Sequence, residues 1–321
     1  MKGIWLENKI LSFRDHLPRP KPSQGEALVK VRVAGICGTD LELTRGYYEF
    51  TGIPGHEFVG DILRAPGRPE REGERVVGEI NVTCGACPAC RAGRPKHCEN
   101  RTVMGIKHRN GAFAEFMCLP LANLITVPDT VCDDAAVFTE PLAAALEIQE
   151  QVPIERNNHV LVLGAGKLGQ LIAQTLASTG CDLKVVARYA NQQKLLAQFN
   201  ISSIVEQTLP AGFFDIVIEA TGSMAGFSLA RRAVRPGGII VLKSTTKGDV
   251  RVNFSTIVVD EVTLIGSRCG PFDPALGLLA NNSVDPTGLI EGRYSLNAIQ
   301  KAFEHASRPG ALKVLLQISG R

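Results

Sequence analysis

Six residues near the middle of the chain restrict its fold more than any other feature. They read Gly164-Ala165-Gly166-Lys167-Leu168-Gly169, directly after the apolar run 160–163, and apolar residues follow them at helical spacing. Glycines spaced in this way between a strand and a helix let the backbone approach a pyrophosphate at the helix N-terminus. The stretch therefore predicts a dinucleotide-binding turn, with cofactor contacts from Gly164, Gly166, Lys167, Leu168 and Gly169.

Strands and helices alternate through the region around this turn. Apolar runs predict further strands at 183–187, 214–220, 238–243 and 262–266, and helices fit around 191–199 and 225–234. Such alternation is typical of a doubly wound parallel sheet. Residues 1–145 instead carry short β-forming runs broken by glycine and proline, so we expect that region to be mostly β.

The residue type after the second predicted strand bears on the choice of cofactor. An acid at this point would bind the adenosine ribose hydroxyls of NAD. The chain has Val186-Ala187-Arg188-Tyr189 instead. The guanidinium of Arg188 suits a 2′-phosphate, so we expect NADP rather than NAD. The alternative is that Arg188 is a solvated loop residue and that NAD binds without the acid.

Four of the nine cysteines lie close together, at Cys84, Cys87, Cys90 and Cys98. Four thiolates in one loop can close tetrahedrally around zinc. In a chain of 321 residues, neither small nor visibly secreted, metal binding is a better interpretation than disulfides. An iron–sulfur cluster or a redox thiol set is the alternative, but Arg91, Arg94 and Lys96 do not suit the apolar surroundings of a cluster. We therefore expect a structural zinc lobe at 84–98.

Three other segments carry side chains that could form an open metal site. They are Cys37-Gly38-Thr39-Asp40, Gly55-His56-Glu57 and Thr139-Glu140-Pro141. A catalytic zinc site uses about three protein ligands and keeps one position for water or substrate. Taken singly, a buried cysteine, a hydrogen-bonded histidine and a helix-capping glutamate would explain these residues. Their joint appearance is what indicates a metal site.

These motifs, in this order, resemble the zinc-dependent medium-chain dehydrogenase/reductase family over essentially the whole chain. Gly73-Glu74-Arg75-Val76, 111–116 and Glu219-Ala220-Thr221-Gly222 belong to the same resemblance. It implies an α/β protein with a GroES-like, mostly-β catalytic domain over 1–145 and a doubly wound Rossmann domain over 146–270. The segment 271–321, whose place the spacing alone leaves open, would return to the catalytic domain.

The resemblance also implies roles for single residues. Glu140 in Thr-Glu-Pro-Leu looks like the polyol, sugar and threonine dehydrogenase branch. The catalytic zinc would be held by Cys37, His56 and Glu140, directly or through water, with Glu57 as an adjacent or exchanging ligand. Thr39 would start a proton relay, for which Glu42 stands nearest to where many relatives have a histidine. Further cofactor contacts are implied at Thr221, Gly222, Ser267 and Arg268.

The implied activity is hydride transfer between a secondary alcohol, polyol or sugar hydroxyl and NAD(P), with two zinc ions per chain. A zinc-independent quinone or enone reductase is one alternative, but it would not need Cys37, His56 and Glu140 together. A cofactor-binding protein without activity is another, and it should have lost a ligand or Thr39. The substrate and the physiological direction stay open.

Charge and hydropathy argue against other classes of protein. The net charge is +3 with basic residues scattered among acidic ones, which does not indicate a nucleic-acid surface. No run approaches the roughly 18 apolar residues of a membrane span, and residues 1–9 lack the apolar segment of a signal peptide. We expect a cytoplasmic protein that acts on a small molecule and binds neither nucleic acid nor membrane. The resemblance implies a homodimer or homotetramer.

Overall fold

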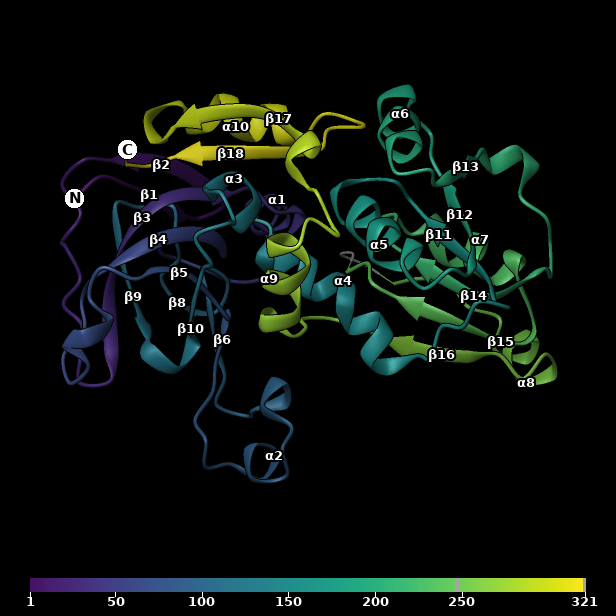
Figure 1. Ribbon diagram of the computed structural model, residues 1–321, viewed down its shortest axis with the longest axis horizontal. Coiled ribbons are helices and arrows are strands. Elements are labelled where there is room, and N and C mark those ends of the chain that lie inside the picture. The colour runs from purple at the N-terminus through teal and green to yellow at the C-terminus, as the bar shows by residue number, and fades with distance from the viewer. Residues whose placement is uncertain (246–248, 320–321) are drawn as a thin grey trace. The chain divides into compact units, whose positions relative to one another are not determined.

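The computed structural model describes residues 1–245 and 249–319, which form two compact units (Figure 1). One unit combines Met1–Glu140 with Phe272–Arg321, and the other is Pro141–Pro271. Strands dominate the first unit, and strands alternate with helices in the second. The expected α/β fold class is confirmed.

A seven-stranded sheet forms the framework of the first unit. Its order is β10-β5-β4-β3-β18-β17, and β9 also pairs with β3. The strands are β3 Glu26–Gly35, β4 Glu57–Arg64, β5 Arg75–Gly78, β9 Phe116–Pro120, β10 Leu124–Thr126, β17 Ile290–Ser295 and β18 Lys313–Gln317. Because β18 pairs antiparallel with β3, a strand from the end of the chain lies inside the sheet that the N-terminal part begins.

Smaller elements surround this sheet. The strands are the hairpin β1 Gly3–Glu7 and β2 Ile10–Arg14, and the three-stranded set β6 Asn81–Val82, β7 Thr102–Met104 and β8 His108–Arg109. The helices are α1 Gly38–Thr44, α2 Pro88–Arg91, α3 Asp133–Ala136, α9 Phe272–Ala280 and α10 Ile299–Ala306, with short 3-10 turns η1 Pro69–Arg71, η2 Pro95–His97, η3 Leu121–Asn123, η5 Thr287–Leu289 and η6 Leu296–Ala298. The apolar face of α10 is buried, as its helical spacing requires.

The second unit is a six-stranded, fully parallel sheet in the order β13-β12-β11-β14-β15-β16. Its strands are β11 His159–Leu163, β12 Asp182–Val186, β13 Ser202–Ile204, β14 Phe214–Glu219, β15 Val234–Leu242 and β16 Thr263–Gly266. The helices are α4 Thr139–Gln151, which starts at the end of the first unit, α5 Lys167–Ala177, α6 Ala190–Gln198, α7 Ala225–Ala233 and α8 Phe254–Val259, with the 3-10 turn η4 Glu206–Thr208. This is the strand order of a doubly wound dinucleotide-binding fold.

Long apolar runs occupy the central strands of that sheet because helices cover both of its faces. Leu161, Val217 and Ile240 are completely buried, one on each of β11, β14 and β15. Within the described residues, no helix is both long and apolar enough to cross a membrane.

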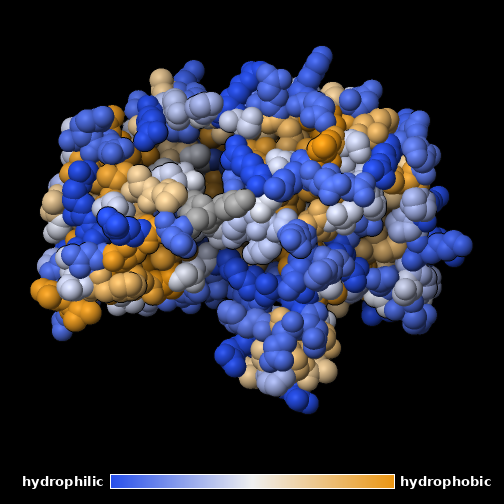
Figure 2. Space-filling model, turned by 180° about the vertical axis from the view of Figure 1, so that it is seen from behind, coloured by the Kyte–Doolittle hydropathy of each residue, from blue (hydrophilic) through white to orange (hydrophobic). Residues whose placement is uncertain are grey.

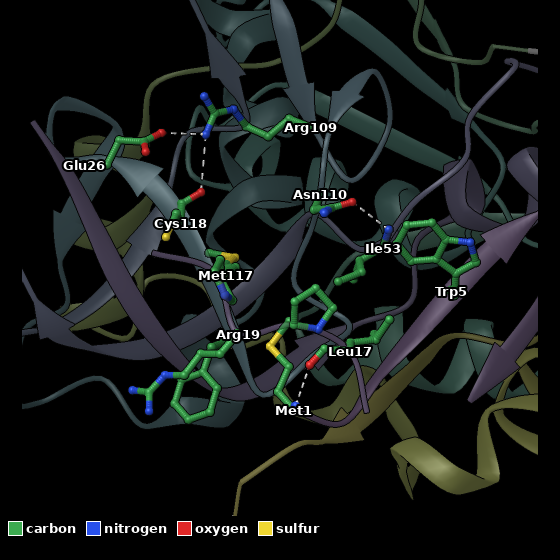
Figure 3. A pocket seen from close by; sticks show the side chains of 13 residues that line it. Met1, Trp5, Leu17, Arg19, Glu26, Ile53, Arg109, Asn110, Met117 and Cys118 are labelled. Carbon is green, nitrogen blue, oxygen red and sulfur yellow. Dashed lines mark hydrogen bonds and ion pairs between the residues drawn. The ribbon is translucent and has the colours of Figure 1, made fainter. Parts of the chain in front are cut away.

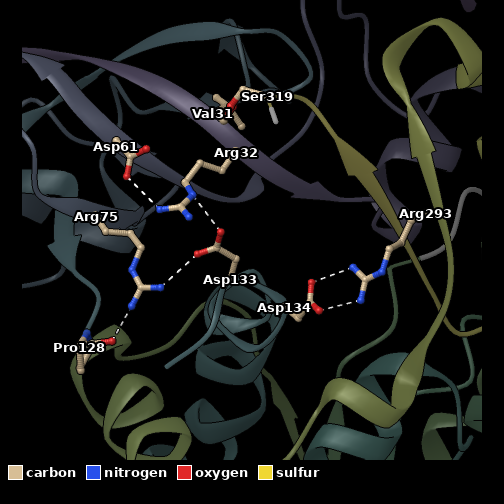
Figure 4. Close-up of polar contacts among 9 residues, drawn as sticks. All are labelled: Val31, Arg32, Asp61, Arg75, Pro128, Asp133, Asp134, Arg293 and Ser319. Carbon is tan, nitrogen blue, oxygen red and sulfur yellow. Dashed lines mark hydrogen bonds and ion pairs between the residues drawn. The ribbon is translucent and has the colours of Figure 1, made fainter. Parts of the chain in front are cut away.

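Asp133 is the centre of the polar contacts that hold α3 to the sheet of the first unit (Figure 4). Its carboxylate accepts Arg32 Nε of β3 at 2.9 Å and Arg75 Nη1 of β5 at 3.1 Å. The Asp133 side chain is only 9% exposed, so water screens these contacts little. The neighbouring Asp134 instead binds Arg293 of β17 through two bonds of 2.7 Å, and both of those side chains are well exposed.

We expect Asp133→Ala to destabilise the first unit by about 2–3 kcal/mol, because it leaves two partly buried guanidinium groups without their carboxylate. Asp134→Ala in the same helical turn is the matched control and should cost about 0.5 kcal/mol, since its ion pair is exposed. For a unit of this size, the two melting temperatures should fall by about 6 °C and about 1 °C. Equal shifts in thermal denaturation would contradict the role given to Asp133.

Candidate functional site

Three of the predicted metal ligands meet in the first unit. One ligand atom each from Cys37, His56 and Glu57 lie within 4.8 Å of one another. Cys37 is the N-cap of α1 just after β3, and His56 and Glu57 stand at the start of β4. His56 and Glu57 are 3% and 1% exposed. The fold therefore gathers a thiol, an imidazole and a carboxylate from separate segments into a largely water-excluded cluster.

The donor set fits a zinc ion. Sulfur, imidazole nitrogen and carboxylate oxygen are all zinc ligands. Among the described residues, the buried Oε1 of Glu57 has no hydrogen-bond partner. A buried oxygen of this kind normally has a polar partner, a water or an ion, so its presence here agrees with a metal at this cluster.

Asp40 orients the histidine of this cluster. Its Oδ1 lies 3.4 Å from His56 Nδ1, and its Oδ2 accepts a hydrogen bond from the Cys37 backbone N–H at 2.8 Å. Carboxylates commonly face the second ring nitrogen of a metal-binding histidine, which leaves Nε2 for the metal. Burial by itself lowers the pKa of His56, but the Asp40 carboxylate and the Cys37 thiolate together raise it well above its usual range. Asp40 was not predicted as a site residue, although Cys37-x-x-Asp40 has the spacing of a helix capping box.

Glu140 lies outside the group of three that share the 4.8 Å limit. It stands in the first turn of α4 and is partly exposed. Burial of its carboxyl raises its pKa to about 7; His56 opposes this shift and Glu57 adds to it. The carboxyl is thus close enough to interact with the cluster, and its ligation of zinc stays a prediction.

The predicted relay residues, Thr39 and Glu42, lie on α1. Thr39 is half-buried, and its Oγ1 is 3.9 Å from Cys37 Sγ. Glu42, the candidate for the next relay step, accepts a hydrogen bond from Arg45 Nη1 at 2.7 Å. Thr39 is therefore placed beside the metal ligands, whereas Glu42 is held by a neighbour on its own helix.

The four-cysteine lobe also comes together in the first unit. Sulfur atoms of Cys84, Cys87, Cys90 and Cys98 lie within 4.8 Å of one another, and none is in a disulfide. A small hydrophobic cluster in the lobe consists of Cys87, Ala89 and Cys98, with Cys90 packed against it. Hydrogen bonds from the backbone N–H groups of Ala86 and Cys87 lower the pKa of Cys84 to about 6, which favours the thiolate that zinc binds. The geometry fits a structural zinc.

The glycines of the predicted dinucleotide turn each have a distinct steric role. Gly164 has φ +98°, a conformation that side chains rarely adopt. A Cβ at Gly166, the N-cap of α5, would meet nothing within 4 Å, which leaves open the space that a pyrophosphate needs. A Cβ at Gly169 would overlap the carbonyl of Gly164, so helix and turn pack directly together. These are the three roles that glycines have in dinucleotide-binding folds.

The other predicted cofactor residues all follow parallel strands of the same sheet. Lys167 and Leu168 open α5 after β11, and Arg188 follows β12. Thr221 and Gly222 follow β14, and Ser267 and Arg268 follow β16. Parallel strands end at one common edge, where doubly wound folds bind their ligands. The fold therefore lines up all these residues at the binding edge of the second unit.

Several of these side chains are already ordered by neighbours. Thr221 N–H and Oγ1 both donate to Oε1 of the buried Glu219. Ser267 Oγ accepts a hydrogen bond from Lys243 Nζ at 3.2 Å. Arg188 is 75% exposed and lies 3.5 Å from Glu206, so its guanidinium reaches into solvent from the edge of the sheet.

A separate pocket of about 290 Å³ lies elsewhere in the first unit (Figure 3). Trp5, Leu17 and Phe116 form part of its apolar wall, and Arg109 at one side is bound to Glu26 at 3.0 Å. None of the predicted site residues lines it. It is therefore distinct from the metal cluster.

Comparison with known proteins agrees with this geometry. Residues 23–129 match the model of the alcohol dehydrogenase GroES-like domain, and residues 147–234 match that of shikimate / quinate 5-dehydrogenase. L-threonine 3-dehydrogenase of Shewanella sp. strain MR-7 is 26% identical, over 98% of this chain and 96% of the relative.

Two solved structures extend the likeness to the whole fold. A protein described as a zinc-binding dehydrogenase, from Sinorhizobium meliloti 1021 and bound to NADP, superposes with a TM-score of 0.91 at 28% identity, covering 98% of both chains. A protein described as a short chain alcohol dehydrogenase, from E. coli CFT073 and complexed with NADH, has a TM-score of 0.89 at 29% identity, covering 99% of both.

The fold and its two metal-binding clusters define a zinc-dependent, dinucleotide-dependent dehydrogenase. The matched domains and the similar proteins agree with the resemblance to the zinc-dependent medium-chain dehydrogenase/reductase family that the sequence motifs indicated.

Proposed function

We propose that this chain oxidises a secondary hydroxyl, or reduces the corresponding ketone, with NADP as the hydride carrier and a zinc ion held by Cys37 and His56. The single observation that carries the proposal is the buried cluster of Cys37, His56 and Glu57, with its unpartnered carboxylate oxygen. Zinc at this site would supply a Lewis acid that makes a hydroxyl easier to deprotonate.

The residues around the cluster have complementary tasks. Cys37 and His56 would hold the metal, and Asp40, whose Oδ1 lies 3.4 Å from His56 Nδ1, would orient the imidazole and leave Nε2 for the metal. Thr39 lies in the first turn of α1, two residues after Cys37. It accepts the proton of the substrate hydroxyl and passes it on. The glycine turn and the strand ends of the second unit bind the dinucleotide. Glu140 stays our candidate for a further ligand.

The proposed substrates are polyols, sugars and secondary alcohols, together with L-threonine, because the similar curated proteins are L-threonine 3-dehydrogenases. A panel of these compounds, each run with NADP and with NAD, tests the proposal. Reduction of the cofactor by at least one class, lost on zinc removal and restored by zinc, is the expected result. Activity that survives complete removal of zinc would contradict it.

The preference for NADP depends on Arg188. We expect Arg188→Ala to raise the KM for NADP about tenfold or more and to leave the KM for NAD nearly unchanged, because one charge-assisted contact to the 2′-phosphate is lost. Glu206→Gln is the variant to compare with it, because it removes the carboxylate that lies 3.5 Å from Arg188. This variant should lower the KM for NADP modestly. Steady-state kinetics with both cofactors measure this. Equal increases in the KM for NAD and for NADP would show that Arg188 does not recognise the 2′-phosphate.

We also propose that the chain forms a homo-oligomer in the cytoplasm. β16 is an edge strand of the parallel sheet, and the adjoining α8 exposes Phe254, Val258 and Val259 by 69%, 73% and 79%. Figure 2 shows a hydrophobic patch at this end of the second unit, at the lower left of the view. An unpaired edge beside exposed apolar side chains favours contact with another chain.

A further inference from the structure

Lys313 and Glu57 form a buried ion pair beside the metal cluster. Both side chains are 1% exposed, and Lys313 Nζ donates a hydrogen bond to Glu57 Oε2. Lys313 Nζ also lies 5.2 Å from the centre of the Phe138 ring, which favours the ammonium by a cation–π contact. Burying two charges is costly unless their geometry is good. Packing alone therefore does not explain why the two charges are buried here.

The strand register explains how the two side chains reach each other. Gly35 of β3 stands opposite Glu57 of β4 on one side and opposite Leu315 of β18 on the other. A Cβ at Gly35 would overlap Oε2 of Glu57. The missing side chain thus opens a passage across β3, through which Glu57 extends toward Lys313 at the start of β18.

The two oxygens of Glu57 consequently have different surroundings. Oε2 is bound to Lys313, whereas the buried Oε1 has no hydrogen-bond partner among the described residues. Glu57 also belongs to the group whose ligand atoms lie within 4.8 Å of one another. One carboxylate thus stands between a fixed ammonium and the place where Cys37 and His56 would hold a metal.

We propose that Lys313 is a positioning residue of the zinc site, which restrains Glu57 so that this carboxylate is not a permanent ligand. The inference rests on the proposed zinc site. A carboxylate held by an ammonium donates less charge to a metal, so the site keeps a net positive charge and an open position for the substrate oxygen. Without Lys313, the metal would be the nearest cation to the buried Glu57 carboxylate. Glu57 would then be a permanent ligand of the metal.

The test compares Lys313→Met, Glu57→Gln and the double variant with wild-type protein, using chelator competition for zinc and the visible spectrum of the cobalt-substituted site. Cys37→Ser, which removes a catalytic ligand, gives the baseline spectrum of the four-cysteine lobe alone. We expect Lys313→Met to bind the catalytic zinc about tenfold more tightly and to show weaker cobalt bands, because a further ligand raises the coordination number. Lys313→Arg keeps the cation and should resemble wild type in both readouts.

The double variant separates restraint of Glu57 from a merely structural role of Lys313. In the Glu57→Gln background, Lys313→Met should change neither zinc affinity nor spectrum, because no carboxylate remains to be released. Unchanged or weaker zinc binding by Lys313→Met, with a wild-type cobalt spectrum, would overturn the inference. If that variant does not fold, Glu57→Gln decides: its zinc affinity should stay within about threefold of wild type, and a larger loss would show that Glu57 is a permanent ligand despite Lys313.

The same measurements distinguish a failure of the proposed function from a failure of the role given to Lys313. If wild-type protein and Cys37→Ser hold the same amount of metal, the proposed function fails and this inference falls with it. If they differ by one ion per chain and the Lys313 variants behave as wild type, only the role of Lys313 is wrong.

Discussion

Cys37→Ser should abolish turnover while the protein still binds NADP. The thiolate is one of the two ligands that we propose for the metal, and loss of the metal would remove several kcal/mol of stabilisation of the developing charge. At about 1.4 kcal/mol per factor of ten, kcat/KM should fall by at least about 1,000-fold. All predicted dinucleotide contacts lie in the second unit, on residues 164–268, so that unit should keep its fold.

Turnover measured with the best substrate of the panel, together with a fluorescence titration of bound NADPH, checks this result. Cys132→Ser is the matched control, because Cys132 is an exposed free thiol outside both metal clusters. A Cys37→Ser protein that has normal turnover, or that loses NADPH binding to the same extent as turnover, would contradict the division of roles between the units.

The second large effect concerns the four-cysteine lobe. Cys90→Ser should cost the protein one zinc ion and open the lobe at 84–98, where three of the four cysteines and Ala89 form the hydrophobic cluster. Structural zinc contributes folding energy directly. A local loss of about 3 kcal/mol would raise the open population, and with it the rate of proteolysis, by about 100-fold.

Limited trypsin digestion measures this opening, since Arg91 and Lys96 lie inside the lobe and neither is followed by proline. The first cut should fall within 84–98, and excess zinc should protect the wild-type lobe but not the variant. Cys181→Ser, at a partly buried cysteine of the other unit, is the control and should be digested as slowly as wild type. A variant lobe as resistant as the wild-type lobe would mean that metal does not hold it together.

The parts of the fold that could be predicted from sequence are those with a local steric or coordination requirement. The turn at Gly164 needs a positive φ, and Gly169 needs the absence of a Cβ, so both positions restrict the residue type by themselves. The four cysteines are specified by their spacing along one loop. The alternation of strands and helices in the second unit follows from burial of both faces of the sheet.

The parts that could not be predicted depend on partners far away in the chain. β17 alternates between partly buried and exposed residues, and it carries the charged Glu291 and Arg293. Its sequence therefore lacks the apolar run that would predict a strand. α8 has exposed apolar residues along a single short stretch, without the periodicity that marks an amphipathic helix. The helix α9 was likewise not predicted.

Lys313 is the clearest case in the site itself. A lysine at the start of an apolar strand is normally solvated, and only the register of β18, β3 and β4 shows that it meets Glu57 across Gly35. The metal cluster depends on distant partners in the same way. The start of β4 places Glu57 with Cys37 and His56, whereas Glu140 stood out by its motif and its ligation of zinc stays a prediction.

Metal analysis of the purified protein tests the central claim most directly. Inductively coupled plasma mass spectrometry should find two zinc ions per wild-type chain, and one each for Cys37→Ser and for Cys90→Ser. That pattern would assign one ion to the cluster of Cys37, His56 and Glu57 and the other to the four-cysteine lobe. A wild-type chain with one zinc, unchanged in Cys37→Ser, would contradict the account of a catalytic zinc site.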